Sequence, residues 1–359
     1  MDEPAARPYR RMSLCCVPAA CYPDSRMPQT DPFRALVLEN HGGTIQASVR
    51  QLPASSLPEG HVLVSIAYSS LNFKDALAVT NRGKIVRRFP MVPGIDFSGT
   101  VAESKSPQFK PGDPVVLTGW GAGEDHWGGL SQFARVKSEW LLSLPDGLTL
   151  KRAMSIGTAG LTAMFCVMAL EEHGVRPDKG SVLVTGATGG VGSVAVMLLA
   201  RLSYHVVAAT GKSDAHELLK SLGAREIIDR RELAVHGDKP LESARWSGAI
   251  DNVGGEILAT VLRHMNRDGC VAAVGLTGGA ELHTTVYPFI LRGVSLVGIA
   301  SGSTPMERRR AARWRLAREL PMETLDQITR VAPLDDVPAL CESMIAGRIR
   351  GRVVVDVNA

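Results

Sequence analysis

The spacing of apolar residues changes near residue 150, and the two parts of the chain predict different structures. Before that point, apolar residues alternate with polar ones or form short β-branched runs, separated by Pro-Gly and Gly-Asp turns. Such runs predict strands at residues 33–38, 61–71, 97–102 and 115–118. From about residue 151 to residue 174, the apolar residues follow a helical period. We therefore expect a β-rich, barrel-like first domain that leads into a long helix.

Residues 181–299 alternate between short apolar runs and segments with a helical period. The runs predict strands at residues 181–185, 204–209, 226–229, 248–251, 269–274 and 294–299. The segments between them predict helices at residues 193–201, 214–222, 256–265 and 286–291. Strands with interleaved helices predict an α/β fold with a doubly wound parallel sheet. We expect a last strand, at residues 350–356, to return to the first domain.

A glycine-rich turn joins the first of these strands to its helix. Its glycines are Gly186, Gly189, Gly190 and Gly192, a spacing one residue longer than in the common dinucleotide motif. Glycine lets the backbone approach a pyrophosphate, and the following helix offers unpaired N–H groups and a partial positive charge. Ordinary strand–helix turns also use glycine, but the strand before it and the helix after it favour a dinucleotide site.

The end of the second strand indicates which dinucleotide binds. A site for NAD usually has Asp or Glu there, which holds the ribose 2′-hydroxyl. This chain has Thr210, Gly211 and Lys212 instead. No carboxylate is present to repel a 2′-phosphate, and the lysine can pair with one, although an ordinary loop lysine is the alternative. The sequence therefore predicts NADPH as the cofactor.

Composition and charge exclude several classes of protein. A chain of 359 residues can form two domains, and 45% hydrophobic with 21% charged residues suits a soluble α/β enzyme. A net charge of +4 is too small to indicate a nucleic-acid partner. The sequence has no obvious apolar run of membrane-spanning length, so we expect no membrane contact. Scattered cysteines without metal-ligand spacing favour a reducing cytoplasm.

Two further segments depart from the regular pattern. Residues 1–32 contain six prolines and no apolar stripe, which predicts a disordered N-terminal extension. Residues 304–307, Thr-Pro-Met-Glu, have the form of a capping box with proline at the first helical position. The arginine-rich helix that follows, from Arg308 to Arg318, predicts a solvated surface. A site for substrate phosphates is the alternative.

The order of these parts resembles the medium-chain dehydrogenase/reductase superfamily over residues 33–359. The blocks at residues 69–77, 89–99, 117–129, 156–163 and 287–292 are similar to its zinc-free acrylyl-CoA reductase branch, whose members are often labelled quinone oxidoreductases. The resemblance implies a GroES-like catalytic domain at residues 33–157 and 301–359. It also implies a Rossmann NADPH-binding domain at residues 158–300.

The resemblance also bears on zinc. Zinc alcohol dehydrogenases of this superfamily place a cysteine, a His-Glu pair and a second cysteine around the catalytic metal. The matching positions here are Asn72, Ile95 with Asp96, and Thr158, and the four-cysteine structural cluster is missing as well. Because zinc sites of this kind need nitrogen and sulfur ligands, we expect a zinc-free protein.

The resemblance implies an enzyme that reduces the activated double bond of acrylyl-CoA to give propionyl-CoA. Hydride adds at the β-carbon, charge builds on the thioester oxygen and needs fixed donors, and a proton adds at the α-carbon. An NADPH:quinone oxidoreductase is the first alternative, because it shares the fold, the cofactor and the lack of zinc. A non-enzymatic NADPH-binding structural or sensing protein is the second.

The candidate catalytic residues are Asn72, Asp75 and His126. Asn72 is a polar group where the metal would be, although a structural turn role is an equal alternative. The family usually has tyrosine where this chain has Phe73, so Asp75 or water are the candidates to replace the missing hydroxyl. His126 lies in a glycine-rich loop and can donate a proton or make local hydrogen bonds only.

The resemblance also implies the cofactor contacts. Residues 188–191 would hold the pyrophosphate, residues 210–212 with Arg230 the adenosine phosphate, and later strand ends the nicotinamide half. Ser301 matches a family contact, but Ala300 replaces the usual acid beside it. The full set is Phe73, Thr162, Thr188, Gly189, Gly190, Val191, Thr210, Gly211, Lys212, Arg230, Asn252, Val253, Gly275, Leu276, Ile290 and Ser301. We expect a CoA thioester as the substrate and a homodimer as the assembly.

Overall fold

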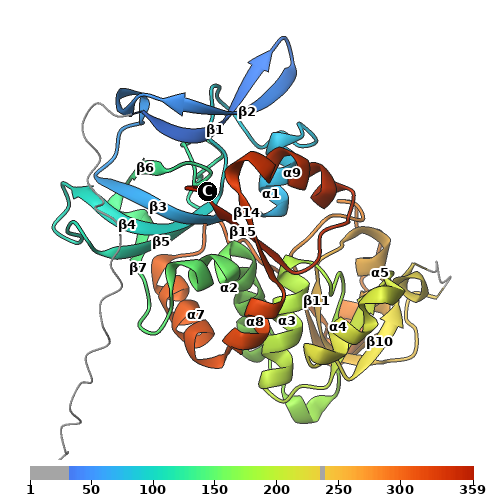
Figure 1. Cartoon of the computed structure of the whole chain (residues 1–359). Helices are drawn as coiled ribbons and strands as arrows, with labels where there is room; N and C mark the ends of the chain where they lie inside the picture. The colour runs from blue at the N-terminus through green and yellow to red at the C-terminus, as the bar shows by residue number, and fades with distance from the viewer. Residues whose placement is uncertain (1–31, 235–238) are drawn as a thin grey trace, which may run out of the picture.

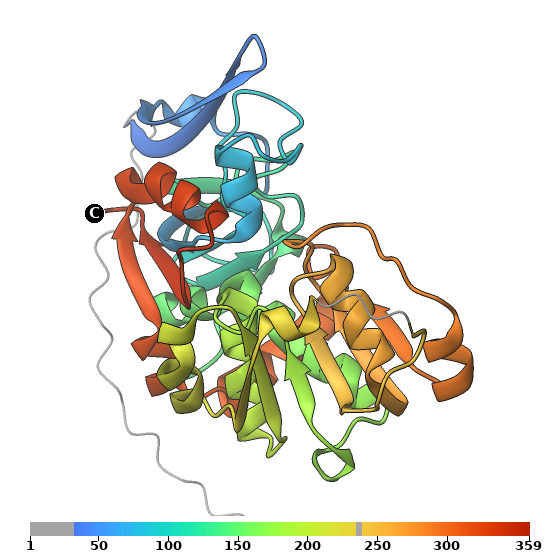
Figure 2. The ribbon, with the colours of Figure 1, turned by 90° about the vertical axis from the view of Figure 1, so that its right-hand side faces the viewer.

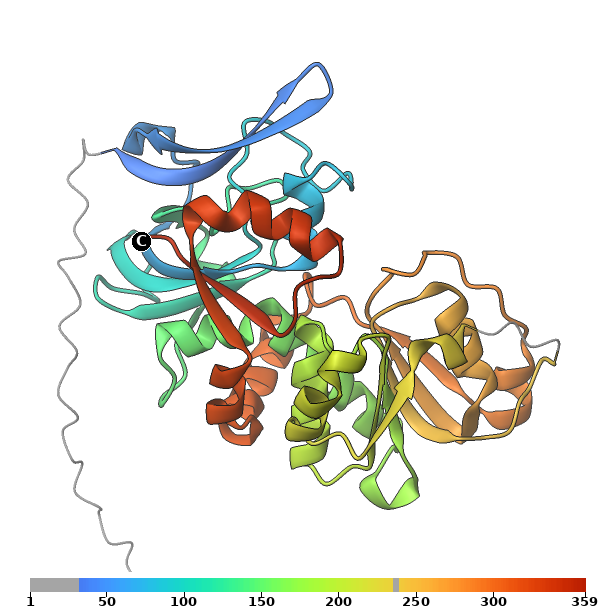
Figure 3. The same ribbon diagram turned by 45° about the vertical axis from the view of Figure 1, so that its right-hand side comes forward.

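The computed structural model describes residues 32–234 and 239–359. The expected N-terminal extension, residues 1–32, lies outside this range apart from its last residue. The described chain forms two lobes, and Figure 3 shows them side by side. The first lobe holds the early strands together with the last ones, and the second holds the parallel sheet (Figure 1). The α/β fold class predicted from the sequence is confirmed.

The first lobe is built on a mixed sheet. In the described residues its strand order is β14-β15-β3-β4-β5-β7, and β6 also pairs with β3. These strands are β3 (Val62–Ser70), β4 (Asp96–Ser104), β5 (Pro114–Thr118), β6 (Phe133–Val136), β7 (Leu141–Ser143), β14 (Thr329–Pro333) and β15 (Arg352–Asp356). A hairpin of β1 (Phe33–His41) and β2 (Thr44–Leu52) lies at one end. Because β15 pairs antiparallel with β3, the predicted return of the last strand is confirmed.

The second lobe is a parallel sheet in the order β10-β9-β8-β11-β12-β13. Its described strands are β8 (Val182–Val184), β9 (Val206–Thr210), β10 (Glu226–Asp229), β11 (Trp246–Asp251), β12 (Met265–Ala273) and β13 (Ser295–Gly298). The helices between them are α3 (Gly190–Arg201), α4 (His216–Ser221), α5 (Gly255–Arg263) and α6 (Tyr287–Arg292) (Figure 2). Successive strands are added in one direction from β8 to β10 and in the other from β11 to β13. Sheets of this kind bind their ligands at the point between β8 and β11 where the direction changes.

A central helix, α2 (Leu150–Glu172), packs against both lobes. It bends at Gly157, whose φ of 51° and ψ of −154° are non-helical and favour glycine. The expectation that no apolar segment reaches membrane-spanning length is wrong, because α2 is long and apolar enough to cross a bilayer. Its apolar window is 89% buried inside the protein, however, so α2 is a core helix here.

The arginine-rich segment differs from its prediction. The helix α7 (Met306–Glu319) begins after Pro305, and the Thr304 hydroxyl donates to the Ala300 carbonyl at 3.1 Å, so the predicted capping box does not form. The predicted solvated face holds for Arg310 and Arg318, which are exposed, but is wrong for Arg309 and Arg313, which are 1% and 3% exposed. Both arginines lie on the buried side of α7, because α7 packs on α2. The next helix, α8 (Met322–Gln327), packs on α2 as well. The domain boundaries at residues 157 and 300 stay predictions.

Candidate active site

A buried carboxylate, Asp96, organises the polar groups at the start of β4. Its Oδ1 accepts hydrogen bonds from the Ser70 backbone N–H at 3.1 Å and the Ser70 hydroxyl at 2.8 Å. Its Oδ2 accepts from the Thr158 backbone N–H at 2.7 Å and the Asn72 side-chain amide at 3.1 Å. Asp96 is fully buried. Three segments far apart in the sequence therefore meet at one acceptor.

Arg352 connects this acceptor to the glycine turn. The guanidinium is 2% exposed and donates to the Ser155 carbonyl at 2.8 Å and the Ser70 hydroxyl at 2.9 Å. A Cβ added at Gly190 would lie 2.9 Å from Arg352 Nη1, so the guanidinium lies against the first turn of α3. Burial lowers the pKa of Arg352, and the charge of Asp96 opposes this shift. Arg352 was not among the predicted site residues, although a charge directly before Val-Val-Val at the start of a strand was a usable signal.

The positions that match the zinc ligands of related dehydrogenases do come together. Asn72, Asp96 and Thr158 share the hydrogen bonds just described, and Ile95 lies beside them in the chain. Within residues 32–234 and 239–359, no group of three or more His, Cys, Asp or Glu side chains could hold a metal ion. The amide of Asn72 is engaged as a donor to Asp96 in this arrangement.

Asp75 anchors the start of α1 (Phe73–Val79). Its Oδ2 accepts from the Asn72 backbone N–H at 2.9 Å, and its Oδ1 accepts from the Ile95 backbone N–H at 3.0 Å. The side chain is 1% exposed. Burial, followed by the nearby charge of Asp96, raises the pKa of Asp75 to about 7, while the two backbone bonds oppose the rise. The geometry supports a capping role, and proton donation by Asp75 stays a prediction.

His126 and Phe73 occupy different surroundings. The His126 Nε2 lies 2.8 Å from the Arg135 carbonyl, and its ring meets the edge of Trp140 at a centroid distance of 5.2 Å. These are the local contacts that the sequence left open as the alternative to proton donation. Phe73 begins α1 and is 36% exposed, so its ring is available to a ligand.

The glycine turn has the geometry expected of a dinucleotide site. Gly186 has a φ of 58°, and a Cβ at Gly192 would lie 2.3 Å from the Gly186 carbonyl oxygen. Gly189 precedes α3, so the amides of Gly190 and Val191 lie in the first helical turn. Thr188 belongs to the same turn and is 7% exposed. Its carbonyl accepts a hydrogen bond from the Gly351 N–H at 3.0 Å.

A cluster of three cations lies at the carboxyl end of β9. The Lys212 ammonium donates to the Ile349 carbonyl at 3.4 Å, and Arg350 pairs with Asp214. Burial lowers the pKa of Lys212, and the positive charges of Arg350 and Arg230 lower it further, against Asp214. A cation with a lowered pKa among like charges favours an anionic partner. The sequence predicted Lys212 and Arg230 here but missed Arg350.

The residues between these cations form a closed turn, and their role in binding the cofactor stays a prediction. The Thr210 hydroxyl accepts from the Lys212 backbone N–H at 3.1 Å, which closes the turn. A Cβ at Gly211 would lie 2.6 Å from Arg230 Nε, so only glycine lets that guanidinium fold over the turn. The remaining candidate of this half, Thr162, lies in α2, where its hydroxyl donates back to the Thr158 carbonyl at 2.7 Å.

The strand ends β11 and β12 supply the next group of candidates. The Asn252 amide donates to the Thr185 carbonyl at 2.7 Å, while its Oδ1 is buried without a hydrogen-bond partner in the described residues. A Cβ at Gly275 would lie 2.1 Å from the Asn252 carbonyl oxygen, so the two strand ends touch. Val253 follows directly and accepts from the Gly278 N–H at 2.8 Å. A buried acceptor beside a glycine cradle fits the amide end of a dinucleotide.

The last three candidates are more scattered. Leu276 is 60% exposed, and Ile290 on α6 is 69% exposed. The Ser301 carbonyl accepts from Arg309 at 2.6 Å, in the loop that leaves the second sheet. The glycine turn, the cations and the Asn252 acceptor follow one edge of the parallel sheet, where its strands end. These residues fit a dinucleotide with a 2′-phosphate.

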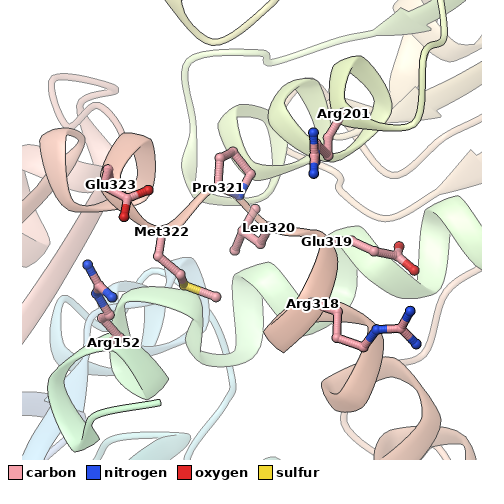
Figure 4. Close-up of a pocket in the computed structure, with 8 residues that line it drawn as sticks. All are labelled: Arg152, Arg201, Arg318, Glu319, Leu320, Pro321, Met322 and Glu323. Atoms are coloured by element: carbon pink, nitrogen blue, oxygen red, sulfur yellow. The ribbon is translucent and has the colours of Figure 1, made fainter. Parts of the chain in front are cut away.

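A separate pocket of about 420 Å³ lies elsewhere in the molecule. Figure 4 shows Arg201, Arg152 and Glu323 around it, from the ends of three helices. Arg201 is the last residue of α3, whereas the glycine turn precedes the first. A helix rises about 1.5 Å per residue, so the length of α3 separates the two. The pocket is therefore not the dinucleotide site.

Comparison with known proteins agrees with this geometry. The family described as "Alcohol dehydrogenase GroES-like domain" matches residues 58–146, and the family described as "Zinc-binding dehydrogenase" matches residues 190–317. The acrylyl-CoA reductase AcuI of Ruegeria pomeroyi is 52% identical over 329 residues, which cover 91% of this chain and 100% of that protein. This chain belongs to the medium-chain dehydrogenase/reductase superfamily.

Two solved structures of superfamily members are similar over their whole length. The crystal structure of YhdH from Escherichia coli K-12 with bound NADPH has a TM-score of 0.89 and 55% identity, covering 90% of this chain and 100% of that one. YhfP from Bacillus subtilis with NAD bound has a TM-score of 0.88 and 45% identity, covering 91% and 99%. The expected GroES-like and Rossmann architecture of this superfamily is confirmed.

The buried carboxyl of Asp75 gives a testable pH dependence. Its pKa rises from 3.8 to about 7 on folding, so the folded protein keeps a proton that the unfolded chain loses between these values. The free energy of unfolding should therefore fall as the pH rises through this window, by at most about 1.4 kcal/mol for each pKa unit. Asp75→Asn cannot titrate and should lack this contribution.

Urea unfolding at several pH values measures the effect, with the exposed Asp178→Asn as the matched control. Loss of one backbone bond adds a constant difference to the Asp75 variant. A wild-type minus variant difference that stays constant from pH 4 to 7 would contradict the assignment.

Proposed function

We propose that this protein is an NADPH-dependent reductase that converts acrylyl-CoA to propionyl-CoA. The observation that carries the proposal is the 52% identity to the Ruegeria AcuI reductase over its full length, across both lobes. The similarity to the NADPH complex of YhdH supports the same cofactor. The chain would thus be an oxidoreductase acting on a carbon–carbon double bond.

The residues of the second lobe would hold the cofactor, which when bound supplies the hydride. The first-turn amides of α3, with Thr188, would bind the pyrophosphate. Lys212, Arg230 and Arg350 would meet the 2′-phosphate at the end of β9. The buried Oδ1 of Asn252, which has no partner in the described residues, would accept a hydrogen bond from a carboxamide N–H.

The residues of the first lobe would act on the thioester. Its carbonyl draws electron density from the double bond, so the β-carbon accepts hydride and the oxygen gains negative charge that fixed donors must stabilise. Asn72, held by Asp96, is the candidate polar group at this end. Asp75, His126 or water would deliver the proton to the α-carbon. Because Asp75 is buried and accepts two backbone hydrogen bonds, a proton from its carboxyl would reach the α-carbon most simply through water.

Zinc independence is part of the proposal. The polar groups at the catalytic position are an amide, a carboxylate and a hydroxyl, namely Asn72, Asp96 and Thr158. Zinc in this superfamily is held by thiolate and imidazole ligands. The Asp96 carboxylate is in addition already bound by four donors.

The assembly and the location complete the proposal. An exposed apolar set lies on α6 and in the loop after β12, and α6 leads into β13, the edge strand of the parallel sheet in the described residues. Its members are Leu276, Val286, Tyr287, Ile290 and Leu291. Burial of such a set favours a homodimer. The described cysteines Cys166, Cys270 and Cys341 are free thiols, which suits the cytoplasm.

The substrate is tested by NADPH oxidation on one preparation with acrylyl-CoA, crotonyl-CoA and simple quinones. We expect acrylyl-CoA to give the highest kcat/KM and propionyl-CoA to be the product. A quinone rate far above the acrylyl-CoA rate would establish the NADPH:quinone oxidoreductase instead. Binding of NADPH without turnover of any acceptor would favour the non-enzymatic alternative.

Lys212→Ala tests the cofactor selectivity. A charge-assisted bond to the 2′-phosphate contributes about 1.5–3 kcal/mol, so NADPH binding should weaken roughly tenfold to a hundredfold. NADH lacks that phosphate, and its binding should barely change. The difference should shrink at high salt, because the cluster is partly exposed to solvent.

Titration of both dinucleotides by fluorescence measures the affinities, with the exposed Lys220→Ala on α4 as the control. If the ratio of NADPH to NADH affinity is unchanged in Lys212→Ala, the selectivity rests on Arg230 and Arg350 instead.

Metal analysis tests zinc independence. Purified enzyme should contain no stoichiometric zinc, and incubation with a chelator should leave kcat unchanged. An activity that the chelator removes and added zinc restores would refute this part of the proposal.

A further inference from the structure

Arg309 on α7 makes an unusually complete set of contacts. Its Nε donates to the Thr304 carbonyl at 2.8 Å, and its Nη1 donates to the Thr118 carbonyl at 2.8 Å and the Thr118 hydroxyl at 3.0 Å. Its Nη2 donates to the carbonyls of Ser301 at 2.6 Å and Gly302 at 2.8 Å. The guanidinium has five N–H groups, and these five bonds match their number.

The acceptors belong to two segments that are distant in the sequence. Ser301, Gly302 and Thr304 form the loop between β13 of the parallel sheet and α7, whereas Thr118 ends β5 of the first lobe. The guanidinium also lies 4.7 Å from the centre of the Trp120 ring, in the turn that follows β5. Arg309 therefore joins the exit loop of one lobe to a turn of the other.

The turn after β5 is held tightly against this loop. The Trp120 N–H donates to the Gly302 carbonyl at 3.1 Å, and Trp120 has a φ of 60°, which is uncommon for a residue with a side chain. A Cβ at Gly119 would lie 2.6 Å from the same Gly302 oxygen. Backbone in such a conformation persists when neighbouring contacts over-determine it, and the bonds of Arg309 supply several of them.

The surroundings of Arg309 do not stabilise its positive charge. Burial lowers the pKa of Arg309 to about 10, and no carboxylate among the described residues offsets this shift. Arg313, one helical turn away, is a second buried cation. A lysine has no planar fork that can bond several carbonyls at once. The contacts therefore use the geometry of the guanidinium, and the buried charge is the unfavourable consequence.

We infer that Arg309 is a positioning residue for hydride transfer. It fixes the loop at residues 301–304, which includes the candidate cofactor contact Ser301, against the Gly119–Trp120 turn of the substrate lobe. The relative placement of nicotinamide and substrate then depends on this side chain, together with the backbone bond from Trp120 to Gly302. The inference rests on the proposed function for the identity of the reaction, but its structural part, the fixed loop, does not.

Arg309→Lys and Arg309→Met test this, with Arg310→Lys as the control because Arg310 is exposed on the same helix. Misplacement of reacting groups by about 1 Å can lower a rate about a hundredfold. We expect kcat to fall roughly tenfold to a hundredfold in both Arg309 variants, while the NADPH dissociation constant changes less than threefold because the phosphates are held elsewhere. NADPH deuterated at the transferred position should give a larger isotope effect on kcat.

Hydrogen exchange gives a readout that is independent of turnover. The amides of Trp120 and Ser303 should exchange faster in the Arg309 variants without NADPH, whereas the amides of β8 should not. An unchanged kcat in Arg309→Lys would overturn the inference, and so would full rescue of both readouts by the lysine. A lower melting temperature with normal kcat and normal loop exchange would show a purely structural role.

A failure of the proposed function can be distinguished from a failure of the inference on Arg309. If wild-type protein reduces a quinone and not acrylyl-CoA, the same comparison is made with the quinone. The exchange of the loop amides is measured without any substrate, so this measurement tests the role of Arg309 whichever reaction the protein catalyses.

Discussion

The hydrogen bonds around Asp96 are the interaction on which both lobes depend. One carboxylate receives donors from β3, from the start of α1 and from the bend in α2. The Ser70 hydroxyl that bonds it also accepts from Arg352, at the start of the returning strand β15. Gly157 can have no side chain at this point, because a Cβ there would lie 2.6 Å from the Ser70 oxygen. A buried acid is costly unless its acceptors are satisfied, and here each segment satisfies it.

Much of the fold was predictable from the sequence because its signals are local. The alternation of apolar runs and helical segments after residue 180 predicted every strand of the parallel sheet to within a few residues. The glycine turn was recognisable since only a backbone without side chains can fold as Gly186 and Gly192 do. The long helix was also predicted, but its bend at Gly157 was not. The residues that leave no room for a side chain at the bend, Ser70 and Arg352, are remote in the sequence.

The candidate site was predictable in part. The candidate phosphate contacts carry their signal in short local stretches, at residues 188–191 and 210–212, whereas Arg350 and Arg352 reach the same site from the last segment of the chain. No periodicity connects residues that far apart. The arginine-rich helix was misinterpreted for a related reason. Charged side chains predict a solvated face, yet Arg309 finds enough carbonyl acceptors to be buried. The roles of Asn72, Asp75 and His126 stay predictions.

The C-terminal segment contacts both stretches of the second lobe that are proposed to bind the cofactor phosphates. The Gly351 N–H meets the Thr188 carbonyl in the glycine turn, and the Ile349 carbonyl meets the Lys212 ammonium. The same segment enters β15, a strand of the other lobe. If these stretches bind the phosphates as proposed, their occupancy and the packing of the C-terminal strand are thermodynamically linked, and such linkage is reciprocal. A change that loosens this strand would lower ligand affinity without touching the ligand, and a bound dinucleotide would tighten the attachment of the strand to its own sheet.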